Sequence, residues 1–124
     1  MSESLPPAID IARVGSYPVL SHSGGGYFFD DVLEYRVWVH PPEGGDDKYQ
    51  TFPTYQQAVA FAGRELGADE PVVLVRQREW VVEQSPGHYV RKTGERLTEW
   101  RVEWLRDRKR LPGAIEQFLA QRVH

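Results

Sequence analysis

The stretch that decides the fold is VLEYRVWVH, at residues 32–40. Its apolar and polar side chains alternate, which is typical of a half-buried β-strand because successive side chains of a strand point to opposite faces. The pattern predicts one strand whose core-facing side carries Leu33, Tyr35, Val37 and Val39.

Other strands are predicted after this one. Residues 48–52 follow a turn-rich connector and predict a short strand that returns as a hairpin. Residues 72–105 predict a meander of three antiparallel strands, with turns at residues 85–87 and at Thr93-Gly94. The last of these strands is the second clean alternation, at residues 96–105, which lines up Thr98, Trp100, Val102 and Trp104.

Two helices are predicted, one in the middle of the chain and one at its end. Thr54 is suited to cap a helix over residues 55–66, and Gly67 to end it. Its buried stripe is expected to contain Tyr55, Ala58, Val59, Ala62 and Leu66. Pro112 fits the first turn of the final helix, whose apolar stripe is expected to contain Leu111, Ile115, Phe118 and Leu119.

These elements predict a single α+β domain over residues 1–124. Strands grouped around two helices, without βαβ alternation, favour a mainly antiparallel sheet of about five to six strands with two covering α-helices. Residues 1–8 are expected to be a loose lead-in because Pro6 and Pro7 disfavour sheet pairing, and Ile9 and Ile11 fit a short edge strand.

The composition indicates in which cellular compartment the protein is expected and which classes of partner it is expected to bind. The 124 residues include no cysteine, which excludes disulfides, thiolate nucleophiles and cysteine-bound metals. The chain opens with neither a basic nor an apolar segment typical of a signal peptide, and no apolar run reaches the length of a membrane span. We therefore expect a cytoplasmic protein with no membrane contact. The net charge of −3 makes nucleic acid an unlikely partner.

A glycine-rich loop is the most conspicuous candidate site. Gly24, Gly25 and Gly26 expose backbone N–H groups that can hold a phosphate. Their spacing matches neither a P-loop nor a dinucleotide-binding motif. Two interpretations stay open: a turn that lets the following aromatic residues pack, or a loop that binds a small phosphate-bearing ligand beside His22.

The polar side of the first strand is a second candidate. Arg36, Trp38 and His40 lie on it together, and exposed Trp and Arg are typical of binding surfaces. Alternatively, a helix covers this side and Trp38 belongs to the core. The four histidines lack the spacing of a metal pair, so the sequence predicts no metal and no cofactor.

A basic run at residues 106–110 is a candidate surface for binding nucleic acid. With Arg76, Arg78, Arg91, Lys92 and Arg101 it suggests a basic face. Glu99 and Glu103 alternate with Arg101, however, and this favours a sheet surface of paired opposite charges.

Several stretches resemble a set of short bacterial proteins of uncharacterised function, some of which are labelled acetyltransferase-related. They are VLSHSGGGYFFD at residues 19–30, EYRVW at 34–38, LVRQREW at 74–80, TGER at 93–96 and EWRVEWL at 99–105. The resemblance implies a bacterial origin and an acyl-CoA-related activity, and it assigns no catalytic residue to this chain.

Two functional hypotheses follow. The first is a small intracellular binding or interaction domain, monomeric or homodimeric. The second is a small transferase or a protein that binds acyl-CoA or another phosphate-bearing ligand through the loop at residues 24–26. Whether the chain is an enzyme stays open. The residues expected to bind a ligand are His22, Gly24, Gly25, Gly26, Arg36, Trp38 and His40.

Overall fold

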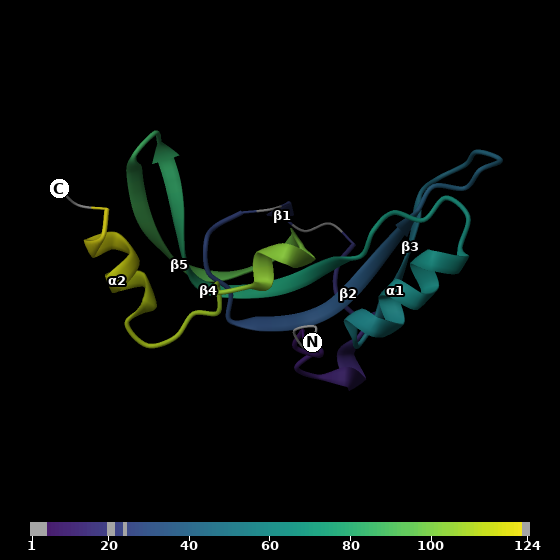
Figure 1. Ribbon diagram of the computed structural model, residues 1–124, viewed down its shortest axis with the longest axis horizontal. Helices are drawn as coiled ribbons and strands as arrows, with labels where there is room; N and C mark the ends of the chain where they lie inside the picture. Colours follow the sequence, from purple (N-terminus) through teal and green to yellow (C-terminus); the bar gives the residue numbers. More distant parts are fainter. Residues whose placement is uncertain (1–4, 20–21, 24, 123–124) are drawn as a thin grey trace.

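The computed structural model describes residues 5–19, 22–23 and 25–122, and it confirms an α+β chain with a mainly antiparallel sheet and two helices. Four antiparallel strands form one curled sheet (Figure 1). They are β2 (Asp31–Val39), β3 (Lys48–Phe52), β4 (Val72–Ser85) and β5 (His88–Arg101), in the order β5-β4-β2-β3. The two-residue β1 (His22–Ser23) adds a short parallel pairing at the outer edge of β5.

The expected count of five to six strands was too high, because residues 72–105 form one long hairpin instead of a three-stranded meander. The predicted turn at Thr93-Gly94 lies inside β5, where Gly94 has a φ of +146° and the pairing with β4 shifts between Gln77 and Glu79. Gly94 therefore lies in a β-bulge, where β5 has one extra residue, and the chain does not reverse there. The predicted strand at residues 96–105 is also too long, since β5 ends at Arg101.

Residues Val102–Leu105 form a 3₁₀ helix, η2, in place of the expected strand end. This turn carries Leu105 into the main apolar cluster, where it is buried. Burial of that side chain, worth about 1.5–3 kcal/mol for a leucine, supplies a physical reason for the turn.

The strand predicted at residues 32–40 is confirmed as β2, with a bulge at its start. Tyr35 and Val37 are fully buried on the predicted face. The pairing with β4 shifts between Val32 and Glu34, so Leu33 points to the opposite face and packs with Tyr17 and Leu74. The prediction that Leu33 shares a face with Tyr35 was therefore wrong, because a bulge interrupts the period of two.

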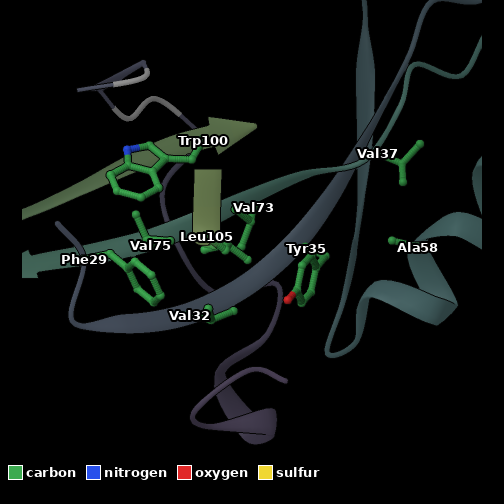
Figure 2. Packing of buried hydrophobic residues seen from close by; sticks show 9 residues of the cluster. All are labelled: Phe29, Val32, Tyr35, Val37, Ala58, Val73, Val75, Trp100 and Leu105. Carbon is green, nitrogen blue, oxygen red and sulfur yellow. The ribbon is translucent and has the colours of Figure 1, made fainter. Parts of the chain in front are cut away.

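The main core lies on the side of the sheet that α1 and η2 cover. Figure 2 shows its side chains converging between the strands, the helix and the segment before β2. Its buried members are Phe29, Val32, Tyr35, Val37, Ala58, Val73, Val75, Trp100 and Leu105.

Helix α1 (Tyr55–Arg64) begins as predicted and ends two residues early. The Thr54 side-chain oxygen accepts a hydrogen bond from the Gln57 backbone N–H at 3.3 Å, which confirms the N-cap. Leu66, expected in the buried stripe, lies beyond the last turn and is 78% exposed. Gly67 then reverses the chain with a φ of +81°.

Helix α2 (Ala114–Ala120) packs against the tip of the β4–β5 hairpin, at the opposite end of the sheet from α1 (Figure 1). Its Ile115 is buried with Phe28 and Val81, as the predicted stripe requires. Leu111, which was assigned to the same stripe, precedes the helix and is exposed.

The N-terminal edge strand is absent from the described residues. Ile11–Arg13 form a short 3₁₀ helix, η1, whose Asp10 side chain accepts a hydrogen bond from the Ala12 N–H. Ile9 and Ile11 are exposed. The alternation that predicted a strand therefore does not correspond to a buried face.

Candidate ligand-binding site

Residues 13–19, here called the strap, cross the face of the sheet opposite the main core. The Gly15 N–H donates to Glu34 Oε1 at 2.8 Å. Arg36 donates from Nη2 to the Pro18 carbonyl at 2.7 Å and from Nη1 to the Val19 carbonyl at 3.5 Å. Two charged side chains of β2 thus hold the strap in place.

The strap covers a buried network of charges. Arg36 Nε pairs with Glu34 Oε2 at 2.7 Å, and both side chains are 0% exposed. Arg36 Nη1 also contacts Glu99 Oε2 at 3.2 Å, and the Trp38 indole N–H donates to the same carboxylate. The predicted residues Arg36 and Trp38 are therefore close together, but their polar groups bond to the protein itself.

A cavity of about 290 Å³ lies between the strap and the sheet. It sits near the lower limit of typical ligand pockets, a size suited to one compact group rather than a whole nucleotide. Three of its residues are cations and one is an anion, which gives a net +2 in a chain whose total charge is −3. The lining consists of Arg13, Ser16, Tyr17, Pro18, Arg76, Glu95, Arg96 and Leu97.

Arg76 lines this pocket and has one donor without a hydrogen-bond partner. Its Nη1 donates to Asp31 Oδ2 at 3.3 Å. Its Nε is buried without a hydrogen-bond partner, and the Glu95 carboxylate stands 3.6 Å away, beyond hydrogen-bond reach. An arginine guanidinium can bind carboxylate or phosphate with two parallel hydrogen bonds.

Tyr17 adds a buried hydroxyl to the same lining. The residue is 6% exposed, its ring packs with Leu33 and Leu74, and the Arg13 guanidinium lies 4.9 Å from the ring centroid. The hydroxyl has no hydrogen-bond partner. Leaving such a group unsatisfied costs about 1–3 kcal/mol.

Arg96 connects the pocket to the glycine-rich loop. Its Nε donates to Gln77 Oε1 at 2.7 Å and its guanidinium stacks on Trp80, while Nη2 is buried without a partner. Burial lowers the pKa of the Arg96 guanidinium. Among the described residues no carboxylate forms an ion pair with Arg96, so this cation lacks a counter-charge.

Gly25 and Gly26 pack directly over these side chains. A Cβ at Gly25 would lie 2.3 Å from Arg96 Nη2, and one at Gly26 would lie 2.7 Å from Gln77 Nε2. The Gly25 carbonyl accepts hydrogen bonds from Gln77 and from the Trp100 indole. The glycines therefore permit a close approach of the loop to the sheet.

The structure describes the other two predicted loop residues, His22 and Gly24, only in part. Gly24 lies outside the described residues. The backbone of His22 pairs with Thr98 in β1, and its side chain is outside the description.

His40 lies apart from this pocket, exposed and directly after the end of β2. Its Nδ1 is 2.8 Å from Asp47 Oδ1 and its Nε2 is 2.7 Å from Asp69 Oδ2. A neutral imidazole carries one N–H, so only the protonated ring can donate to both carboxylates. The hydrogen bond to Asp69, followed by that to Asp47, raises the pKa of His40.

The His40 bridge predicts a defined pH dependence. Because the folded pKa lies above the ordinary value, the bridge stabilises the fold fully below about pH 6.5 and is lost as the pH rises through the folded pKa. An NMR titration of the ring should give a raised pKa that falls in Asp69→Asn. The difference in melting temperature between the wild type and His40→Gln should shrink towards alkaline pH. A His40 pKa unchanged in Asp69→Asn would contradict this account.

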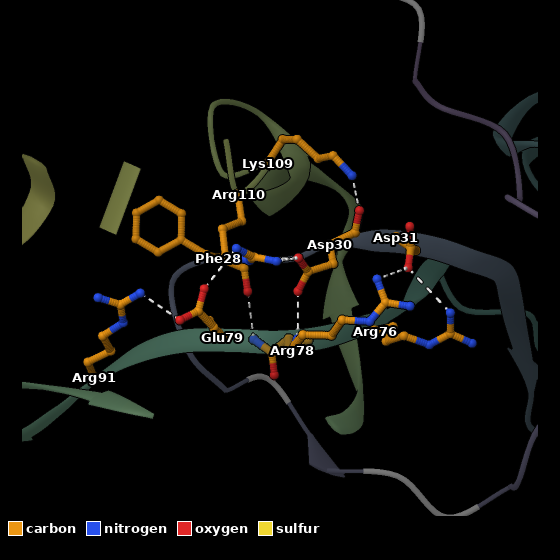
Figure 3. A network of polar contacts seen from close by, with 10 residues as sticks. Phe28, Asp30, Asp31, Arg76, Arg78, Glu79, Arg91, Lys109 and Arg110 are labelled. Atoms are coloured by element: carbon orange, nitrogen blue, oxygen red, sulfur yellow. Dashed lines mark hydrogen bonds and ion pairs between the residues drawn. The ribbon is translucent and has the colours of Figure 1, made fainter. Parts of the chain in front are cut away.

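The basic run at residues 106–110 folds back onto the molecule. Arg110 bonds to Asp30 and Glu79, and Glu79 also pairs with Arg91, as Figure 3 shows. The Lys109 ammonium donates to the Asp30 carbonyl. These contacts anchor the segment before α2.

The sequence missed the pocket because its residues are far apart in the chain. The sequence assigned no site to Arg13 or Tyr17. Arg76 was interpreted as part of a basic face and of a charged interruption at a sheet edge or a bulge. The available signal was the charged sequence RQRE at residues 76–79, which interrupts an apolar strand that otherwise reads as buried.

No family model, curated protein or solved structure matches this chain. Within the described residues, none of the helices has the length and apolar character needed to cross a bilayer.

Proposed function

We propose that this chain is a small binding domain that holds a compact oxyanion, such as the phosphate group of a metabolite, in the pocket beneath the strap. One observation carries the proposal. Within the described part of the chain, three side chains contain a buried polar atom without a hydrogen-bond partner, and all three residues line this pocket. They are Tyr17, Arg76 and Arg96, and each of these side chains carries hydrogen-bond donors.

The surrounding charges support an anionic ligand. Arg13, Arg76 and Arg96 outnumber Glu95, and their guanidinium groups are suited to phosphate or carboxylate. The Glu95 carboxylate lies 3.6 Å from Arg76 Nε and would compete with an incoming anion. Removing its charge is therefore expected to strengthen binding.

Isothermal titration with inorganic phosphate, sulfate and acetate tests this proposal. We expect a dissociation constant on the order of 1 mM or below for phosphate. Arg76→Gln should weaken binding about tenfold or more, because it removes a charge-assisted hydrogen bond worth about 1.5–3 kcal/mol. Tyr17→Phe should weaken binding without lowering the melting temperature, since its hydroxyl has no partner in the free protein.

The matched control is Arg91→Gln, which removes the same charge from an exposed site outside the pocket. Its affinity should equal that of the wild type, whereas Glu95→Gln should bind more tightly. No heat with any of the anions would contradict the proposal, as would equal losses in Arg76→Gln and Arg91→Gln.

Acetyl-CoA belongs in the same titration, because the resemblance to acetyltransferase-labelled proteins predicts an acyl-CoA-related ligand. Binding tighter than that of phosphate, and sensitive to Arg76→Gln, would favour this second reading. The pocket would then hold one phosphate group of the molecule.

A further inference from the structure

One acidic side chain lines the pocket beneath the strap, together with three cations. This is Glu95, whose side chain is 67% exposed. Its Oε1 lies 3.6 Å from Arg76 Nε, and the part of the chain that the structure describes donates no hydrogen bond to this carboxylate. Glu95 is therefore held there by a single long ion pair, which leaves its carboxylate able to take another cationic partner.

A β-bulge places Glu95 at this pocket. The pairing of β4 with β5 shifts between Gln77 and Glu79, and Glu95 is one of two residues of β5 that lie opposite a single residue of β4 there. Consecutive side chains of a regular strand point to opposite faces, and a bulge changes this alternation locally. Glu95 and its neighbour Arg96 both line the pocket, so an acid and a base border the same space.

An anion that binds Arg76 changes the surroundings of Glu95. The ligand and the carboxylate would then share one guanidinium, and two like charges a few ångströms apart repel each other. A positive group on the same ligand offsets this repulsion, because it pairs with Glu95 in place of Arg76. The pocket therefore favours a ligand that carries both charges over one that carries the anion alone.

We propose that the ligand of this pocket is a compact zwitterion, with an oxyanion that binds Arg76 and Arg96 and an ammonium group that binds Glu95. This inference rests on the proposed anion site and names the class of molecule that it holds. Arg76 Nε and Glu95 Oε1 are 3.6 Å apart, so the two charges of the ligand are expected within a few bonds of each other. The volume of about 290 Å³ has room for such a molecule.

Isothermal titration with matched pairs of ligands tests this inference. O-phosphoethanolamine and propyl phosphate differ only in that a methyl group replaces the ammonium, and β-alanine and butyrate form the same pair for a carboxylate. At about pH 8 the phosphates are doubly charged and the amines protonated. The wild type should bind the zwitterion of one pair about two- to fivefold more tightly, as expected for an exposed ion pair. The pair that shows this preference identifies the oxyanion.

Glu95→Gln should abolish the preference, because the ammonium then meets only cations in the pocket. The matched control is Glu103→Gln, which changes an exposed glutamate that pairs with an arginine outside the pocket. It should keep the preference of the wild type, and circular dichroism should show that both variants are folded.

Three results would overturn the inference, and they separate it from the proposed anion site. Equal affinities within both pairs would exclude a zwitterion while leaving the anion site in place. A preference that persists in Glu95→Gln would show that the ammonium does not bind Glu95. No binding of either phosphate and of either carboxylate would contradict the anion site itself, and this inference with it.

Discussion

Replacing Arg36 by alanine should lower the free energy of unfolding by about 3–5 kcal/mol, because it leaves the carboxylate of Glu34 buried without its counter-ion. The variant also removes the donors that hold the Pro18 and Val19 carbonyls, so the strap should loosen. Urea denaturation followed by tryptophan fluorescence measures the loss.

Two further variants make this expectation specific. Arg101→Ala removes an arginine from an exposed ion pair and should change stability by no more than about 1 kcal/mol. Replacing Arg36 by methionine together with Glu34 by leucine should recover part of the loss, because no unpaired charge then remains buried. A cost for Arg36→Ala as small as that of Arg101→Ala would show that the buried network does not hold the strap.

Gly67→Ala and Gly63→Ala should change stability in opposite directions. Gly67 has a φ of +81°, and a Cβ there would lie 2.0 Å from the His40 carbonyl oxygen. Left-handed strain alone costs about 1–3 kcal/mol, and the contact with His40 adds to it. Gly63 lies inside α1 with open space around it, so alanine should stabilise the helix by about 0.5–1 kcal/mol.

Thermal denaturation at one fixed protein concentration compares the two variants. Equal losses in both would mean that the reversal after α1 is not fixed by the conformation of Gly67.

The regular elements were predictable where one local pattern decides the structure. The alternation around Tyr35 predicted β2, and the spacing of Thr54, Gln57 and Ala58 predicted the start of α1. These signals are local because a strand or a helix that buries one face must repeat with its own period. Ile115 and Phe118 identified α2 in the same way.

The irregular features were not predictable, because they depend on partners that are distant in the sequence. The bulge that turns Leu33 away from Tyr35 is stabilised by Tyr17 and Leu74 on the other face. Gly94 looks like a turn residue, yet β4 continues to pair with β5 beyond it. Only the tertiary contacts decide between a bulge and a regular strand at Leu33, and between a turn and a continued strand at Gly94.

The candidate site was predictable in its parts but not in its arrangement. The sequence left two interpretations of the glycine-rich loop, a turn that lets aromatic residues pack and a loop that binds phosphate. The structure shows Gly25 against Arg96 and Gly26 against Gln77, contacts that neither interpretation predicted. Arg36 was recognised on the polar side of its strand, where the sequence favoured neither an exposed nor a covered face. The strap covers that face, and its hydrogen bonds to Glu34 and Arg36 have no signature in the sequence.

The central claim is that Tyr17, Arg76 and Arg96, which each have a polar atom without a hydrogen-bond partner, form an anion site beneath the strap. The most direct test is a ¹H–¹⁵N spectrum of the arginine Nε–H groups during titration with phosphate. The account predicts that the Arg76 signal shifts with saturation, while that of Arg91 stays in place. An Arg76 signal that does not move, or Arg76 and Arg91 signals that move together, would contradict it.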